Sequence, residues 1–335
     1  MLYLENGYVD AKMIIDMPYP FVFCTGGRGT GKTYGGLKEA VENHSGHFQL
    51  MRRTQTELDN IANEANSPFK VLNTDYGYGI TVKGHKNYAG IYNKEGKSIG
   101  QMVALSTVSN IRGFDSSEVD LCIYDEFIPE AHKTPIKNEH LAFLNYYETV
   151  NRNREFSGRE PLKIRCFSNA NDIMNPLIVG LGLVTKMDKM RKKKQEIYID
   201  KERGYVLIDL SDSPISKKKE KTALYRFAGE GEFANMAIKN DFNSPLSDPT
   251  PRPLREYIPI LKVGELCVYK HKSNGMYYVS EKSSGTVPEF TMKDTDLKRL
   301  RLAYPWLIEK YFTKRLEFES SICEILFLRY WKIVF

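Results

Sequence analysis

Residues 26–33 read G-G-R-G-T-G-K-T, and this segment constrains the fold more than any other part of the chain. The apolar run PFVFCT at residues 20–25 predicts a short buried strand before it, and a helix should follow over residues 31–43. A strand, a turn of the pattern G-x-x-x-x-G-K-T and a helix form a phosphate-binding loop of the Walker A type. The chain is therefore predicted to bind a nucleoside triphosphate.

The residue types in this loop each have a chemical reason. Glycines let the backbone curl so that successive N–H groups point at phosphates, and the positive end of the following helix adds to the attraction. We expect Lys32 to reach the β- and γ-phosphates and Thr33 to offer its hydroxyl to Mg²⁺. The alternative is a glycine-rich turn with an exposed lysine. The predicted nucleotide-binding residues are Gly26, Gly27, Arg28, Gly29, Thr30, Gly31, Lys32 and Thr33.

A second buried strand, VDLCIY at residues 119–124, runs into Asp125 and Glu126. An acid at the C-terminal end of such a strand lies beside the phosphate-binding loop, because ligands collect at that edge of a parallel sheet. We expect Asp125 to hold Mg²⁺ through water and Glu126 to polarise the attacking water as a base. Alone, an acidic pair in this position is commonly a solvated strand end. Paired with residues 26–33, it is a Walker B motif and predicts hydrolysis.

Residues 185–188, Thr-Lys-Met-Asp, match the guanine-reading pattern of GTPases. A GTPase should also carry Asp-x-x-Gly after the strand that bears the Mg²⁺ acid. Here that position reads Asp-Glu-Phe-Ile, and the chain contains no Asp-x-x-Gly. We therefore interpret the four-residue match as chance and expect ATP.

Two further positions fit an ATPase motor. The strand at residues 161–167 ends in Ser168 and Asn169, where an amide could sense the γ-phosphate and the attacking water; a strand-to-turn asparagine is the alternative. Arg152 and Arg154 follow a predicted helix, and an arginine supplied to a neighbour's γ-phosphate strongly stabilises the transition state. A basic helix end favoured by the helix dipole is the alternative there.

Composition indicates a soluble globular protein, with 41% hydrophobic and 27% charged residues. The formal net charge of +6 is compatible with a polyanionic partner without requiring one. The five cysteines lie far apart in apolar runs, which predicts reduced core residues rather than zinc ligands. The N-terminus lacks the regions of a signal peptide, and the apolar C-terminal run is too short to span a bilayer, so we expect a cytoplasmic protein.

Strands that alternate with helices, and strands that read as near-continuous apolar runs, predict an α/β fold with a largely parallel sheet. Residues 69–105 are rich in Gly, Tyr, Asn and Lys and predict β-hairpin strands that end in the apolar run QMVALS. Further strands are expected at residues 47–53, 161–169 and 204–210, and further helices at residues 56–65 and 139–149.

Basic and proline-rich runs indicate a domain boundary after residue 210. MDKMRKKKQ and SDSPISKKKEK flank the last predicted strand, and NSPLSDPTPRPLREYIP follows them. We predict an ATPase domain at residues 1–210, a basic linker at residues 211–234 and a small α+β domain at residues 235–335. In that domain a hairpin should turn at residues 273–275, and helices should follow from about residue 293.

The order of these motifs resembles the DNA-packaging ATPases of small phi29-type tailed phages, which belong to the additional-strand (ASCE) class of P-loop proteins. The segments that carry the resemblance lie between residues 20 and 180: G-G-R-G-T-G-K-T, M-R-R, I-Y-D-E-F-I, E-T-V-N-R-N-R-E, C-F-S-N-A and I-M-N-P. The resemblance implies a homopentameric ring at the portal vertex of the prohead in the host cytoplasm. The ring would drive double-stranded DNA inward by ATP hydrolysis, and a structural RNA is a further candidate partner.

The resemblance also implies roles for single residues. Arg28 corresponds to the arginine that such motors keep inside the Walker A loop. Arg152 matches their trans-acting arginine finger, with Arg154 in reserve. Asn169 falls in the motif that couples hydrolysis to movement.

DNA contacts are implied in the same way. Residues 106–117, STVSNIRGFDSS, would face the channel of the ring, and Arg112 is the one base among them. Arg112 is therefore the candidate phosphate contact, with Lys133 and Lys137 as helpers. A surface arginine with no such role is an equal alternative for Arg112.

In large terminases the C-terminal domain is an RNase H-like nuclease whose clustered acids bind two metal ions. Here the candidate first strand, ELCVYKHK, carries Tyr269 and Lys270 where an acid would be needed. Asp209 is the only aspartate that we place on a strand after the ATPase motifs, and it lies before the linker, outside the C-terminal domain. We therefore interpret this domain as a vestigial nuclease-like fold that docks on DNA, portal or RNA. Three alternatives stay open: a large terminase with an active nuclease domain, a P-loop phosphotransferase, and a non-hydrolysing nucleotide-gated binding module.

Overall fold

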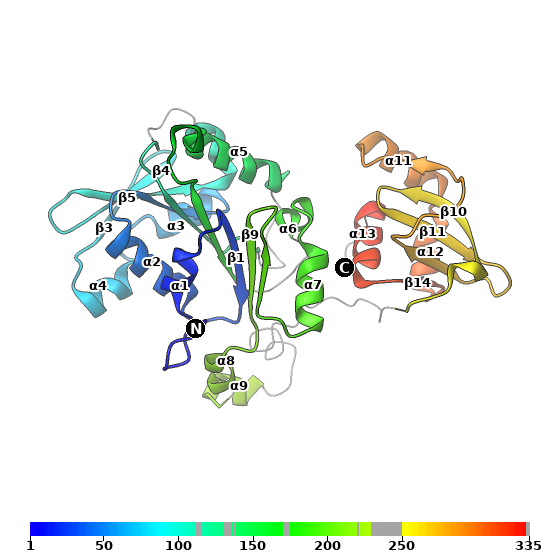
Figure 1. The fold of residues 1–335 in the computed structure, drawn as a ribbon, viewed down its shortest axis with the longest axis horizontal. Coiled ribbons are helices and arrows are strands. Elements are labelled where there is room, and N and C mark those ends of the chain that lie inside the picture. The colour runs from blue at the N-terminus through cyan, green and yellow to red at the C-terminus, as the bar shows by residue number, and fades with distance from the viewer. Residues whose placement is uncertain are drawn as a thin grey trace. The chain divides into compact units, whose positions relative to one another are not determined.

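The computed structural model describes residues 1–111, 116–129, 136, 138–169, 175–219, 221–228 and 250–332. The chain divides into two compact units, Met1–Asn243 and Ser244–Phe335, and each is described by itself. Figure 1 shows the elements of both units along the chain. In the described part of the chain, no helix is both long enough and apolar enough to cross a membrane.

The N-terminal unit is built on a nine-stranded sheet with the order β3-β4-β5-β2-β6-β7-β1-β9-β8. The six neighbouring strands from β5 to β9 in this order are all parallel, while β3, β4 and β8 are added antiparallel at the two edges. The largely parallel α/β sheet predicted from the sequence is thus confirmed. The strands are β1 Phe21–Gly26, β2 Phe48–Arg52, β3 Thr81–Gly84, β4 Tyr88–Tyr92, β5 Ser98–Ala104, β6 Leu121–Asp125, β7 Lys163–Ser168, β8 Ile197–Asp200 and β9 Tyr205–Leu210.

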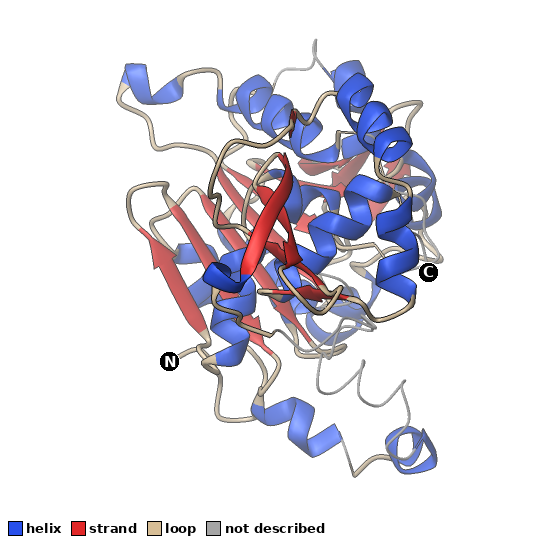
Figure 2. Cartoon of the chain, turned by 90° about the vertical axis from the view of Figure 1, so that its right-hand side faces the viewer, coloured by secondary structure: helices blue, strands red, loops and turns tan. Residues whose placement is uncertain are grey.

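Helices cover both faces of this sheet, and Figure 2 distinguishes them from the strands by colour. On one face, Val22 and Cys24 of β1 share a core with Leu37 of α2. On the other face, Phe23 of β1 packs against Phe143 of α5 at 6.1 Å between ring centroids. Burial on both faces explains why the central strands read as continuous apolar runs. The helical elements are α1 Ala11–Asp16, α2 Lys32–Asn43, α3 Gln55–Ile61, α4 Lys70–Tyr76, η1 Leu105–Ile111, α5 Glu139–Asn151, η2 Arg154–Ser157, α6 Pro176–Gly180, α7 Val184–Lys192, α8 Pro214–Lys219 and α9 Ala223–Ala228.

Two sequence expectations for this unit are wrong in part. Residues 70–76 form helix α4 rather than a hairpin strand, with Leu72 buried and Gly77 in the left-handed conformation that ends helices. The lysine run after residue 186 lies mostly in helix α7 rather than in a linker. Met187 and Met190 of α7 are buried one turn apart, so the run is the solvated side of an amphipathic helix.

The C-terminal unit contains a five-stranded sheet with the order β13-β10-β11-β12-β14. The hairpin predicted to turn at residues 273–275 is confirmed, because β11 and β12 pair antiparallel across it. The predicted C-terminal helices are also present, with β14 between them. The elements are η4 Leu254–Glu256, β10 Tyr257–Val263, β11 Leu266–His271, β12 Tyr277–Ser280, β13 Glu289–Phe290, α11 Asp294–Ala303, α12 Trp306–Phe312, β14 Leu316–Phe318 and α13 Ser321–Trp331.

The first strand of this unit differs from the sequence expectation. Strand β10 begins inside the proline-rich run, so Tyr269 and Lys270 lie on the second strand rather than the first. Pro259 is accommodated at a register shift in the β10–β11 pairing. Asp209 lies in β9 of the other unit, where it accepts a hydrogen bond from the Ser211 backbone at 3.0 Å. Among the described residues, no group of three or more His, Cys, Asp and Glu is placed to hold a metal ion.

Candidate functional site

The glycine-rich motif and the acidic motif meet at one edge of the parallel sheet. Strands β1 and β6 both pair with β7, so their carboxyl ends point the same way. The loop at residues 27–31 follows β1, and Asp125 is the last residue of β6. This edge, where the connections leave the strands, is where parallel α/β sheets bind ligands.

The loop after β1 depends on two glycines in the left-handed region. Gly29 has φ +65° and Gly31 has φ +93°, values that L side chains rarely adopt. A Cβ atom at Gly31 would also lie 3.2 Å from the ring of Tyr8. Helix α2 then begins at Lys32, one residue beyond this turn. The predicted strand, glycine turn and helix are therefore all present.

The side chain of Lys32 lies across its own loop. Its Nζ donates hydrogen bonds to the carbonyls of Gly26 at 3.1 Å and Gly27 at 3.0 Å and to Thr30 Oγ1 at 3.0 Å. Burial lowers the pKa of the Lys32 ammonium to about 8, and the positive charge of Lys219 acts in the same direction. A buried ammonium held by neutral acceptors would gain most from an anionic ligand.

Thr33 and Asp125 form the pair expected of an Mg²⁺ site. Thr33 Oγ1 donates to Asp125 Oδ1 at 2.6 Å, although the residues are 92 positions apart in the sequence. Asp125 is almost completely buried. A hydroxyl and a carboxylate are the hard oxygen ligands that Mg²⁺ prefers, so the residues present fit the ion.

Glu126 follows Asp125 in a strained backbone conformation, with φ +56°. Its N–H donates to the Phe167 carbonyl of β7 at 2.7 Å, which fixes the turn against the sheet. Its carboxylate is half exposed and pairs with Arg52, whose Nη1 lies 2.6 Å from Glu126 Oε2. The Nη2 of Arg52 lies 3.2 Å from Asp125 Oδ2. One guanidinium therefore joins both acids.

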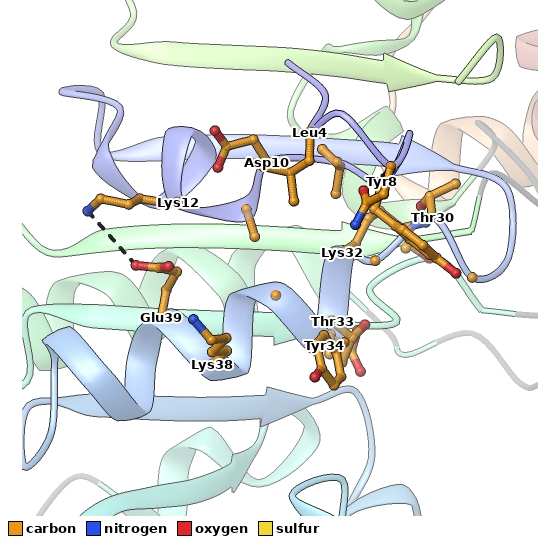
Figure 3. A pocket seen from close by; sticks show the side chains of 18 of the residues that line it. Leu4, Tyr8, Asp10, Lys12, Thr30, Lys32, Thr33, Tyr34, Lys38 and Glu39 are labelled. Carbon is orange, nitrogen blue, oxygen red and sulfur yellow. Dashed lines mark hydrogen bonds and ion pairs between the residues drawn. The ribbon is translucent and has the colours of Figure 1, made fainter. Parts of the chain in front are cut away.

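A cavity of about 920 Å³ encloses these groups. Figure 3 shows that the first residues of the chain form one of its walls, with Tyr8 beside Thr30 and Lys32. The Val9 N–H donates to the Thr30 carbonyl at 3.0 Å, which ties this N-terminal segment to the loop. The lining residues are Leu4, Asn6, Tyr8, Val9, Asp10, Ala11, Lys12, Gly29, Thr30, Gly31, Lys32, Thr33, Tyr34, Gly35, Lys38, Glu39, Tyr76, Asp125, Glu126, Ser168, Asn169 and Lys219.

Asn169 lines this cavity, as its predicted role requires. The preceding residue, Ser168, is buried at the end of β7, and its hydroxyl bonds the backbone N–H and carbonyl of Ile128. These bonds tie the end of β7 to the chain that follows Glu126.

The two arginines after α5 have different environments. Arg152 is exposed at the C-terminal end of α5, and its Nε donates to the Thr149 carbonyl at 3.3 Å. Arg154 is buried, and its Nη2 donates to the carbonyls of Val119 at 2.7 Å and Ser117 at 3.2 Å. Arg154 is thus engaged in holding the chain before β6, whereas Arg152 lies at the surface.

A family model described as Podovirus DNA encapsidation protein (Gp16) matches residues 7–299 of the chain. The chain belongs to this family. It is 30% identical over 225 residues to the DNA packaging protein of Bacillus phage B103, and the match covers 66% of this chain and 63% of that protein. The DNA packaging protein of Bacillus phage phi29 is 29% identical over 225 residues, which cover 66% of this chain and 61% of that protein.

These matches confirm the resemblance drawn from the motifs. The chain spans less than two thirds of the length of either relative. A chain of the solved bacteriophage phi29 viral genome packaging motor assembly has the same fold, with a TM-score of 0.67 and 18% identity over 97% of this chain and 99% of that one.

Three predicted residues of this encapsidation family member lie outside the described residues. They are the candidate DNA contacts Arg112, Lys133 and Lys137. The segment that resembles a guanine-reading motif, residues 185–188, lies in helix α7, where the Lys186 ammonium sits over the Tyr198 ring at 4.8 Å.

Sequence reasoning assigned no role to three residues of the site: Arg52, Tyr8 and Lys219. A signal existed for Arg52, because it ends a buried strand next to that of Asp125, but strand order is not readable from the chain. Asp10 caps α1 through a hydrogen bond from the Met13 N–H at 3.2 Å, so a helix start was also readable beside Tyr8. Lys219 lies in the run predicted to be a linker.

Proposed function

We propose that this chain is an ATPase that uses ATP hydrolysis to translocate double-stranded viral DNA into the prohead. The observation that carries the proposal is the meeting of Thr33, Asp125 and Glu126 in one cavity, with Thr33 Oγ1 2.6 Å from Asp125. Membership of the DNA encapsidation family supports DNA as the molecule that is moved.

The phosphate-binding loop would hold ATP through the backbone of residues 26–33 and the Lys32 ammonium. Thr33 and Asp125 would hold Mg²⁺, which neutralises charge that develops on the β- and γ-phosphate oxygens. Arg28 is placed in the same loop, and its carbonyl accepts a hydrogen bond from Lys219.

Glu126 would serve as the base in hydrolysis, with Oε2 accepting the proton of the attacking water. It must first release Arg52, to which that oxygen is bonded in this structure. Asn169 lines the same cavity, where its amide would orient the attacking water. Arg152, exposed at the end of α5, is our candidate for the arginine that a neighbouring subunit receives at its γ-phosphate.

The partners belong to the proposal as well. We infer a homo-oligomeric ring, with a pentamer as the expected number, that acts in the host cytoplasm at the portal of the prohead. A structural RNA is a further candidate partner. Arg112, Lys133 and Lys137 stay the proposed DNA contacts, and the domain from about residue 235, after the basic linker at 211–234, is the proposed nuclease-like docking domain.

The test compares wild type with Glu126→Gln in phosphate release and in protection of packaged DNA from nuclease. We expect E126Q to bind ATP normally but to hydrolyse it at least about 100-fold more slowly, since it removes the base. Packaging should be lost with it. Glu95→Gln, at an exposed carboxylate between β4 and β5, is the matched control and should package normally. Packaging by E126Q at the wild-type rate would refute the proposal.

A further inference from the structure

Helix α8 places Lys219 at the phosphate-binding loop. The Lys219 ammonium donates a hydrogen bond to the backbone carbonyl of Arg28, and the side chain lines the same cavity as Lys32 and Thr33. A Cβ atom at Gly29 would collide with this ammonium. The absence of a side chain at Gly29 therefore leaves room for a lysine from more than 180 positions along the chain.

Helix α8 is docked rather than loose. Ser213 and Ser216 are buried, and their hydroxyls lie 2.7 Å apart. The Lys218 ammonium donates to the Asn6 carbonyl at 3.1 Å, and the Pro214 ring packs close to Gly7. These contacts fix α8 against the N-terminal wall of the cavity, so the position of Lys219 is set by the packing of the residues just before it.

The charge of Lys219 is not balanced within the described residues. No carboxylate there forms an ion pair with it, and partial burial lowers its pKa. Its charge also helps to lower the pKa of Lys32. Two ammonium groups that repel each other in one cavity favour the binding of a polyanion, because its attraction to both of them offsets their mutual repulsion.

We propose that Lys219 is a second phosphate-binding lysine, which contacts the terminal phosphates of the nucleotide. This inference rests on the proposed nucleotide-binding function. The ammonium would exchange the neutral Arg28 carbonyl for a phosphate oxygen, which is the stronger, charge-assisted acceptor.

The experiment is a calorimetric titration of the full chain with ATP and Mg²⁺. Lys219→Ala is expected to raise the Kd for ATP about tenfold, the loss typical of one charged hydrogen bond. Lys219→Arg should restore the affinity to within about threefold, because a cation remains. A purely structural role, in which Lys219 only donates to the Arg28 carbonyl, would instead lower the unfolding temperature of K219A. Thermal unfolding of each variant should be unchanged, since Lys219 is not part of the core.

Two variants separate this inference from the proposed function. Lys217→Ala removes an exposed ammonium of α8 that takes no part in the contacts above, and should bind ATP like wild type. Lys32→Ala should lose most ATP affinity. Wild-type affinity in K219A together with a loss in K32A would overturn the role of Lys219 and leave the nucleotide site intact. If wild type itself failed to bind ATP, both proposals would be wrong.

Discussion

Arg52, the last residue of β2, bridges the two acids at the end of β6, with 2.6 Å between Nη1 and Glu126 Oε2 and 3.2 Å between Nη2 and Asp125 Oδ2. The bridge joins residues more than 70 positions apart because β2 and β6 are neighbours in the sheet. It holds Oε2 of the proposed base in an ion pair. This oxygen must leave the pair before it can accept a proton from water.

Arg52→Gln is therefore expected to raise the rate of ATP hydrolysis in the absence of DNA by about fivefold, because the ion pair with Arg52 no longer restrains Glu126. The extra stimulation by DNA and proheads should shrink accordingly. Phosphate release with and without both partners measures the ratio. Arg203→Gln, which removes an exposed guanidinium bonded to the Leu181 carbonyl, is the control. An equal fall of both rates would show that Arg52 assists hydrolysis instead of restraining it.

The lowered pKa of Lys32, about 8, predicts a pH dependence of nucleotide binding. The free protein loses this proton near pH 8, whereas the complex keeps it because a phosphate stabilises the charge. Binding above pH 8 must therefore take up a proton, and the Kd for ATP should rise up to about tenfold per pH unit. Below about pH 7, one unit under this pKa, the contribution of Lys32 is nearly constant. Titrations between pH 7 and pH 9.5 test this slope.

Lys32→Arg provides the comparison for that experiment. A guanidinium stays charged throughout this range, so the variant should bind more weakly at pH 7 but with a flat profile. An identical slope in wild type and K32R would assign the pH dependence to another group.

The parts of the site that the sequence predicted are those in which local order determines geometry. Residues 26–33 form their loop because the turn, the two left-handed glycines and the helix start are all adjacent in the chain. Asp125 was predictable because a buried strand delivers its last side chain to one edge of the sheet. In both cases the chemistry follows from spacing along the chain.

The missing parts depend on which elements are neighbours in space. Arg52 reaches Glu126 only because β2 lies beside β6. These strands are not consecutive in the sequence, so their pairing cannot be predicted from the chain alone. Lys219 lies in a lysine-rich run, and this composition alone predicts side chains that are exposed to solvent. The same composition hid α7, where the spacing of Met187 and Met190 was the better signal. A helix that is rich in charged residues and buries few apolar side chains is therefore difficult to predict from its sequence.

Arg152 and Arg154 should respond differently to replacement by alanine. Arg154→Ala removes a donor from the Val119 carbonyl and one of the two donors of the Ser117 carbonyl, the other being Arg159, and should cost about 1–3 kcal/mol of stability. Arg152→Ala should leave stability unchanged but reduce ATP hydrolysis by the assembled ring about 1,000-fold or more. Thermal unfolding and phosphate release measure the two effects.

Mixing subunits gives a sharper test of Arg152. R152A keeps an intact site, and E126Q keeps an intact arginine, so mixed rings should regain hydrolysis that neither variant shows alone. If the ATPase rate of the mixture only equals the sum of the rates of the two separate variants, Arg152 does not act on a neighbour's site.

The buried ion pair between Arg53, the residue after β2, and Glu139, the first residue of α5, has 2.8 Å between Nε and Oε1. Both side chains are almost fully buried, and Tyr124 Oη donates to the same carboxylate at 3.3 Å. Glu139→Gln keeps the shape but leaves a buried guanidinium without a counter-charge. We expect a loss of about 3 kcal/mol in the stability of the N-terminal unit. Urea unfolding followed by circular dichroism measures it.

Glu95→Gln is the matched control, because it breaks an exposed pair with Lys94 at 3.8 Å and should cost less than about 1 kcal/mol. The double variant Arg53→Met with Glu139→Met removes both charges, so no desolvated charge is left alone. It should therefore recover much of the stability that E139Q loses, since apolar residues of similar volume often replace buried ion pairs without penalty. A double variant as unstable as E139Q would show instead that the hydrogen bonds of this pair, rather than its charge balance, stabilise the junction of β2 and α5.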